Sequence, residues 1–268
     1  MPGFFPFVMP WDSAPNGSAA DVSFLNHKPA GKHGRVVAKG PQFVLSGTGE
    51  RIKFFGTNVG SRAAFPEKAD ADKIAARMAK LGINIVRFHH LNNGWDTEIG
   101  TIWKQGRLHV EIDPKMVDKL DYFVAALKKQ GIYTNLNLQT SREMVPELGF
   151  PESVKQIPNF QKKVDKVNRR MIELQKQYAK DLLDRVNPYT GIKYKDDPAV
   201  MVIEINNENS LAGWPGEAPG AGVTAWPEPF RGEMKGLWNK WLVKRYGSDA
   251  KLREAWPTSR NLTGASQF

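Results

Sequence analysis

The residues with the most evident chemistry close an apolar segment near residue 200. Residues 199–205 are apolar apart from Glu204, and Asn206, Asn207 and Glu208 follow directly. Carboxyl groups transfer protons, and amide groups hold polar substrates by hydrogen bonds. Because neighbouring side chains of a strand face opposite ways, Glu204, Asn206 and Glu208 would share one face. The pattern predicts a polar face, able to do acid–base chemistry, at the end of a buried strand.

The opposite face of this strand would hold Met201, Ile203 and Ile205. Three other predicted strands also carry polar residues on a single face. These residues are Arg87 and His89 in 83–89, Asn135, Asn137 and Gln139 in and after 132–138, and Asn58 at the end of 52–58. Since they gather toward the C-terminal ends, we expect one shared polar site at that end of a parallel sheet.

Burial of so many polar groups requires an explanation. An unpaired buried polar group costs about 1–3 kcal/mol, and a buried charge costs more. An ion pair of Arg87 with Glu204 or Glu208 would satisfy one carboxylate, and this structural interpretation is one alternative. The other is a functional site at the C-terminal rim of a parallel barrel, where enzymes of that fold hold their chemistry.

Helical and strand-like segments alternate in a regular order. Apolar residues at helical spacing predict helices over 69–81, 114–130, 168–186 and 234–246. Strands are predicted over 52–58, 83–89, 132–138 and 199–206. This alternation favours an α/β fold of parallel strand–helix–strand units, and both a barrel and a doubly wound sheet fit it. No glycine-rich dinucleotide or P-loop motif follows any of these strands.

The first part of the chain has a different character. Residues 1–34 are rich in Pro, Gly, Ser and Asn without a period, and 35–55 alternates apolar and polar residues around turns. We predict an irregular lead-in with a short β-hairpin over 1–50, followed by one α/β domain over 51–268.

The chain has 268 residues, no cysteine and a formal net charge of +10. Without Cys there are no disulfides, thiolate metal sites or thiol nucleophile. The basic residues form scattered pairs, so we expect no specific nucleic-acid partner, and no apolar run is long enough for a membrane helix. The Phe4–Trp11 stretch lacks the basic flank of a signal peptide. We interpret it as the start of a mature chain and expect a secreted or periplasmic location.

Four segments together resemble a known enzyme family. Val202–Ser210, with its Asn-Glu pair, resembles the fourth strand of a clan A glycoside hydrolase of the cellulase-like or β-galactosidase-like type. Asn84–His90 resembles the second strand, Phe54–Asn58 the first, and Trp238–Trp256 the segment after the acid/base. The resemblance implies a (β/α)8 TIM barrel, of which this chain holds the first four strand–helix units. It also implies a retaining β-glycosidase that acts on a β-linked oligo- or polysaccharide.

The resemblance implies roles for individual residues. Glu208 matches the general acid/base, which protonates the leaving oxygen and then activates water. Asn207 matches the residue that hydrogen-bonds the sugar 2-hydroxyl, so the strand has to end or bulge between these two neighbours. Arg87 matches the arginine that orients the nucleophile, and Glu204 matches an inward structural acid. Gln139 stands near a place where many members have a histidine.

Other residues are candidates for substrate contact. Trp95 and Trp103 follow the second strand, and their indoles either stack on a sugar or form the loop's own small core. His89 and His90 either touch substrate or satisfy the strand end. The expected substrate-binding set also includes Asn58 and Asn137. No spacing of His, Asp and Glu resembles a metal site, so we expect neither metal nor cofactor.

The family's nucleophile is a glutamate at the end of the seventh strand. A barrel of eight units takes about 250 residues, whereas only 60 residues follow Glu208, and they offer Gly222–Trp226 as a poor strand candidate. We therefore expect the nucleophile to be absent and the isolated chain to be inactive, with Glu204 too deep on the same strand to replace it. Three interpretations stay open: a piece of a longer glycosidase, a half-barrel completed by another chain, and a non-catalytic carbohydrate-binding or interaction protein.

Overall fold

The computed structural model describes residue 3 and residues 19–211 and 222–257, so Phe4–Trp11 lies outside the described residues. The chain divides into two compact units. The larger comprises residues 1–143 and 175–208, and the smaller comprises 144–174 and 209–268.

A four-stranded parallel sheet forms the centre of the larger unit. Its strands, in spatial order, are β4 (Gly56–Gly60), β5 (Ile85–His89), β6 (Tyr133–Gln139) and β9 (Val200–Asn206). The sheet confirms the predicted α/β class with parallel strands. β4 begins later than the predicted 52–58, because Arg51–Ile52 forms a separate strand, β3, that pairs antiparallel with β2.

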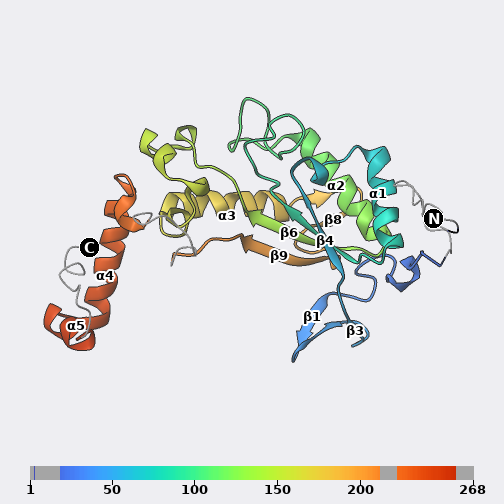
Figure 1. Cartoon of the computed structure of the whole chain (residues 1–268), viewed down its shortest axis with the longest axis horizontal. Helices are drawn as coiled ribbons and strands as arrows, with labels where there is room; N and C mark the ends of the chain where they lie inside the picture. The colour runs from blue at the N-terminus through green and yellow to red at the C-terminus, as the bar shows by residue number, and fades with distance from the viewer. Residues whose placement is uncertain (1–2, 4–18, 212–221, 258–268) are drawn as a thin grey trace. The chain divides into compact units, whose positions relative to one another are not determined.

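Helices cover one face of this sheet (Figure 1). They are α1 (Lys68–Lys80), α2 (Pro114–Lys129) and the second half of α3 (Arg169–Leu183). α2 begins where predicted, since the side chain of Asp113 accepts a hydrogen bond from the backbone N–H of Lys115 and Pro114 occupies the first turn. Leu120, Phe123 and Leu127 of this helix are fully buried against the sheet.

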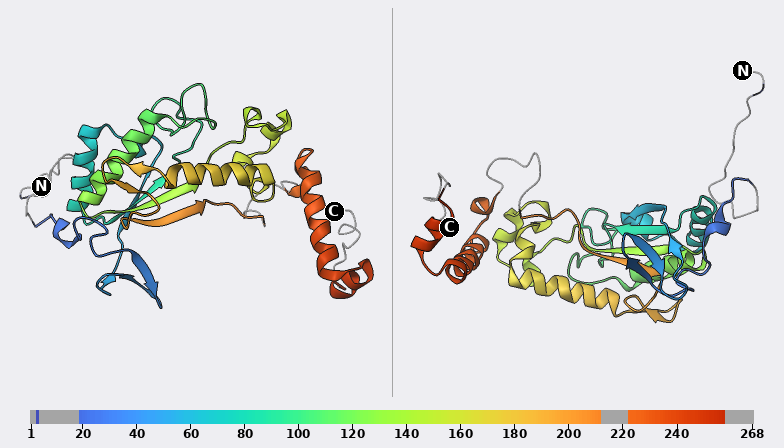
Figure 2. Two further views of the ribbon diagram at one scale, coloured as in Figure 1. Left: turned by 180° about the vertical axis from the view of Figure 1, so that it is seen from behind. Right: turned by 90° about the horizontal axis from the view of Figure 1, so that it is seen from below.

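The predicted hairpin is a three-stranded antiparallel sheet of β1 (Val36–Lys39), β2 (Gln42–Leu45) and β3. It lies on the side of the parallel sheet away from the helices (Figure 2). Leu45 there packs with Tyr133 and Met201, near the N-terminal ends of β6 and β9. A second hairpin, β7 (Val186–Asn187) with β8 (Ile192–Lys193), follows α3.

A bulge in β9 overturns one prediction about strand faces. Thr134 of β6 pairs with Val200 and the next residue pairs with Val202, so the register skips Met201. Two residues of β9 therefore oppose one of β6, and the side chain of Met201 turns to the face opposite Ile203. The predicted shared face of Met201 and Ile203 is wrong for this reason.

The smaller unit consists of helices and short 3₁₀ turns. Its longer helices are α4 (Phe230–Tyr246) and α5 (Asp249–Ala255), and its 3₁₀ turns are Pro146–Leu148, Glu152–Gln156, Asn159–Gln161, Val164–Lys166 and Val223–Ala225. Further 3₁₀ turns, Ser23–Leu25 and Ser61–Ala64, belong to the larger unit. The poor strand candidate Gly222–Trp226 is thus a 3₁₀ turn. Within the described ranges, no helix has the length and apolar character needed to cross a membrane.

Candidate active site

The side of the parallel sheet away from the helices changes character along the strands. At the N-terminal end it is apolar, with Tyr133 and Met201 in one cluster. Further along, neighbouring strands place polar residues in register, namely Asn58 with Arg87, Arg87 with Asn135, Asn137 with Glu204 and Gln139 with Asn206. The strands thus bring the predicted polar residues together at their C-terminal ends.

Arg87 links Glu204 and Asn207 through hydrogen bonds. Its Nε and Nη2 donate to the two carboxylate oxygens of Glu204 at 2.7 and 2.6 Å, and Nη2 also donates to Asn207 Oδ1 at 2.8 Å. Of the two carboxylates that the sequence allowed as partners, the structure pairs Arg87 with Glu204. The hydrogen bonds from Arg87 hold the pKa of Glu204 below its ordinary value, so Glu204 stays ionised at neutral pH.

Asn137 is the acceptor at the centre of the site. It is fully buried, and its Oδ1 accepts from His89 Nδ1 and Thr140 Oγ1, both at 2.7 Å, and from Arg87 at 3.3 Å. Since an amide oxygen only accepts, Nδ1 of His89 carries a proton. Burial, together with the charge of Arg87, lowers the pKa of His89, so its ring is neutral at pH 7. The buried Asn137 side chain therefore fixes the positions of His89, Thr140 and Arg87 through its hydrogen bonds.

The chain leaves the sheet between Asn206 and Glu208. The backbone N–H of Asn207 donates to the carbonyl of Gln139 at 2.9 Å, and Glu208 then adopts a left-handed conformation with φ 48° and is exposed. The strand thus ends here, as expected from the sequence if Asn207 and Glu208 are to face the same site. The hydrogen bonds to Glu204 raise the pKa of Arg87, and the negative charge of Glu208 adds to this shift.

The loop after β5 carries an exposed aromatic group. Trp95 is 54% exposed, and its ring stands edge-on to His90 with the centroids 4.9 Å apart. His90 Nδ1 lies 3.0 Å from the hydroxyl of Ser141, which follows β6. On the other side of β5, Asn58 is exposed on the outer strand β4.

Trp103 does not share this exposure. It is 2% exposed, the guanidinium of Arg142 lies 4.8 Å from its ring centroid, and the ring of Tyr178 lies 5.4 Å away. The expectation of a sugar-stacking Trp103 is therefore corrected: the indole belongs to the main core between the sheet and its helices. Gln139 is also buried and donates to the carbonyl of Arg142 at 3.4 Å.

Two asparagines of the loop after β5 were not predicted as site residues from the sequence. Asn92 is fully buried and ties the loop to β6 by donating to the carbonyl of Leu138 and accepting from the N–H of Ser141. Asn93 is also fully buried and closes the loop on itself. The signal that could have found them is the Asn-Asn-Gly sequence directly after a polar strand end, where turns form.

Metal binding has no support in the described part of the chain. Across residues 19–211 and 222–257, no group of three or more His, Asp or Glu side chains is placed to hold an ion.

Replacement of Arg87 by methionine is expected to lower the free energy of unfolding by about 2 kcal/mol, because Glu204 and Asn207 lose their donor. The pair is about three-quarters buried, so the loss is smaller than for a fully buried pair. The double variant R87M/E204M should recover most of the loss, since it leaves no unpaired charge. Urea denaturation measures all three proteins.

Arg169→Met is the matched control, because Arg169 pairs with Glu173 while 91% exposed and should cost less than about 1 kcal/mol. A double variant less stable than R87M would contradict the predicted coupling.

Comparison with known proteins shows the family to which the chain belongs. The family model described as Cellulase (glycosyl hydrolase family 5) matches residues 45–243. The chain is 29% identical over 222 residues to mannan endo-1,4-beta-mannosidase 4 of Oryza sativa subsp. japonica, covering 78% of this chain and 45% of that protein. It is 25% identical over 194 residues to mannan endo-1,4-beta-mannosidase F of Aspergillus fumigatus, covering 69% of this chain and 41% of that protein.

Among solved structures, the endo-1,4-beta-mannanase from Rhizomucor miehei has the same fold. The TM-score is 0.51 at 24% sequence identity, and the match covers 76% of this chain and 58% of that one. The chain spans less than half the length of the rice and Aspergillus relatives. Because the family model matches well over half of its residues, the chain belongs to glycosyl hydrolase family 5.

Proposed function

We propose that this protein acts in the hydrolysis of 1,4-β-linked mannan with retention of configuration, with Glu208 as the general acid/base. The observation that carries the proposal is the arrangement at the end of β9. There Arg87 donates a hydrogen bond to Asn207, and the next residue, Glu208, lies beyond the strand with its side chain exposed. The names of the plant and fungal relatives, mannan endo-1,4-beta-mannosidases, favour mannan as the substrate. Because such a polymer does not cross membranes, the proposal places the protein in a secreted or periplasmic location.

In the proposed mechanism, Glu208 donates a proton to the glycosidic oxygen as the bond to the sugar breaks. It then takes a proton from the water that attacks the glycosyl intermediate. Asn207, held by Arg87, is placed to hydrogen-bond the 2-hydroxyl of the reacting sugar. In mannose this hydroxyl is axial, and in glucose it is equatorial, so Asn207 stands where the two sugars differ.

We further propose that the nucleophilic carboxylate lies outside these 268 residues. Retaining enzymes hold their two carboxyl groups about 5–5.5 Å apart. Glu204 lies on β9, four residues before Glu208, rather than across the site, and both of its oxygens already accept from Arg87. In this proposal the four strand–helix units are the first half of a (β/α)8 barrel, and the other half comes from further residues or from another chain.

The outer strands of the sheet support the proposal that further strands complete the barrel. β4 and β9 are the outer strands of the described sheet, and Ile205 of β9 is 75% exposed. An exposed strand edge with apolar side chains favours pairing with further strands.

Two measurements on the 268-residue chain test the proposed function. Incubation with 1,4-β-mannan should release no reducing ends above a protein-free blank, because the nucleophile is missing. Titration calorimetry should show that mannohexaose binds more tightly than cellohexaose, and Asn207→Ala should reduce this preference. Equal or tighter binding of cellohexaose contradicts the mannan assignment. Mannan turnover that Glu208→Gln abolishes would place the nucleophile inside the chain.

The exposed edge gives a separate prediction. The chain should self-associate at high concentration in size-exclusion light scattering, and Ile205→Lys should shift it toward the monomer, since a charged edge side chain opposes strand pairing. Val243→Lys is the matched control, because Val243 is similarly exposed but lies on helix α4. If both variants behave alike, the edge of β9 is not the associating surface.

A further inference from the structure

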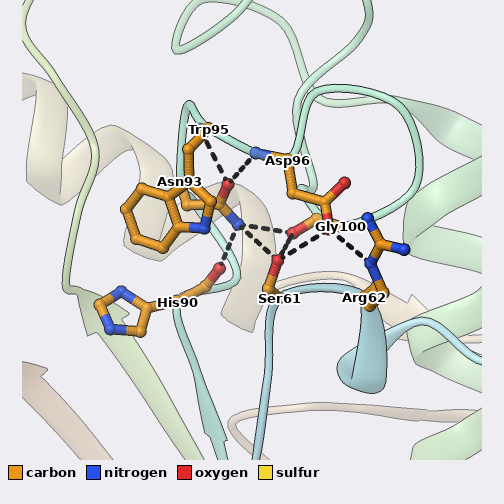
Figure 3. A network of polar contacts seen from close by, with 7 residues as sticks. All are labelled: Ser61, Arg62, His90, Asn93, Trp95, Asp96 and Gly100. Atoms are coloured by element: carbon orange, nitrogen blue, oxygen red, sulfur yellow. Dashed lines mark hydrogen bonds and ion pairs between the residues drawn. The ribbon is translucent and has the colours of Figure 1, made fainter.

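The loop from His90 to Gly100 places the ring of Trp95 next to the ring of His90 (Figure 3). Trp95 stands edge-on to His90, and more than half of its surface is open to solvent. An indole partly exposed beside a second ring offers an apolar face to the C–H groups of a sugar.

Asn93 provides the inner support of this loop. Its side-chain NH₂ donates to the carbonyls of His90 at 2.8 Å and Gly100 at 2.5 Å, and its Oδ1 accepts from the N–H groups of Trp95 at 3.1 Å and Asp96 at 3.0 Å. One fully buried amide thus binds the beginning, middle and end of the loop. The N–H of Trp95 itself is among its partners, so Asn93 directly sets where the indole leaves the backbone.

Outer contacts restrict the same loop. The carboxylate of Asp96 accepts from the hydroxyl of Ser61 at 3.1 Å and from Arg62 Nε at 2.9 Å, which ties the loop to the turn after β4. A methyl group at Gly100 would collide with the Asp96 carboxylate. At Gly94, a methyl group would come within 2.5 Å of the imidazole of His109. The loop therefore packs closely on both sides of Trp95.

We propose that Asn93 is a positioning residue, which fixes Trp95 against His90 so that the two rings receive one sugar unit of a β-mannan chain. This inference rests on the proposed function and adds to it a residue that need not touch substrate. Loss of Asn93 frees the loop, so binding of the sugar then has to order Trp95 as well.

The experiment is a double-mutant cycle on the 268-residue chain, with titration calorimetry of mannohexaose. Asn93→Ala and Trp95→Ala should each raise Kd about tenfold, the scale of one aromatic contact, and the double variant should be no weaker than either single one. Asp96→Ala, which removes the contacts to Ser61 and Arg62 but leaves the Asn93 side chain in place, should raise Kd about threefold. This variant keeps the test available if Asn93→Ala does not fold. Lys104→Ala is the control, since Lys104 pairs with Glu111 on the surface, and should leave Kd unchanged.

A second readout is independent of sugar. The fluorescence of Trp95, obtained by subtracting the spectrum of Trp95→Phe, should change in Asn93→Ala because the indole leaves the imidazole. Additive losses in the cycle, or wild-type binding by Asn93→Ala, would overturn the positioning role. Wild-type binding by Trp95→Ala would overturn the aromatic subsite while leaving the proposed function intact. Failure of the unmodified chain to bind mannohexaose would overturn both.

Discussion

In an assembly that hydrolyses mannan, Glu208→Gln is expected to lower kcat about 10²–10⁴-fold, the usual contribution of a positioned acid/base. Glutamine keeps the shape of the side chain but neither donates a proton to the leaving oxygen nor accepts one from water. Because Glu208 is exposed and lies beyond β9, the substitution should leave the free energy of unfolding nearly unchanged. Rates on 1,4-β-mannan and urea denaturation check the two parts.

The choice of leaving group separates the two functions of Glu208. In a dinitrophenyl β-mannobioside, the dinitrophenolate leaving group departs without protonation. The Glu208→Ala variant should therefore form the glycosyl intermediate from this substrate rapidly and hydrolyse it slowly. This predicts a burst of dinitrophenol equal to the enzyme concentration, and azide should restore turnover by replacing the activated water. Glu204→Gln is the matched control on the same strand, and azide should not rescue it. A Glu208 variant within tenfold of the parent on mannan would contradict the assignment.

Acidification is expected to destabilise the fold through His109. This residue is 4% exposed, and burial with the nearby charge of Arg142 lowers its pKa from 6.5 to about 4. Between these values the unfolded chain binds a proton that the native chain does not, so the free energy of unfolding falls as the pH falls. The contribution of His109 is complete above pH 6.5 and is lost by pH 4, a total of about 3 kcal/mol.

His109→Asn tests this prediction with little change of structure. Nδ1 of His109 accepts from the N–H of Glu143 at 3.2 Å, an acceptor that asparagine can supply. Asparagine also tolerates the left-handed backbone at this position, φ 63°. Urea denaturation from pH 7.5 to 4 should show the stability difference between parent and variant shrinking by about 3 kcal/mol. Other titrating groups, including His89, cancel in this difference, so parallel curves would refute the prediction.

Much of the fold could be predicted because its elements are locally encoded. Buried parallel strands need apolar residues on both faces, and β9 shows them in a run over 199–205 that Glu204 alone interrupts. Asp113 and Pro114 mark the start of α2 by a capping bond that involves only neighbouring residues. The α5 helix was missed, as was the third strand of the small antiparallel sheet, because segments of two to seven residues carry too short a periodic pattern.

The sequence by itself determined that polar side chains collect at the C-terminal ends of four strands, because the two-residue period of a strand follows from backbone geometry alone. Only the tertiary structure decided how these side chains are used. It paired Arg87 with Glu204, buried Trp103 while exposing Trp95, and reversed Met201 through a bulge. Each of these outcomes depends on contacts between segments tens of residues apart, where register and packing rather than local pattern set the free energy.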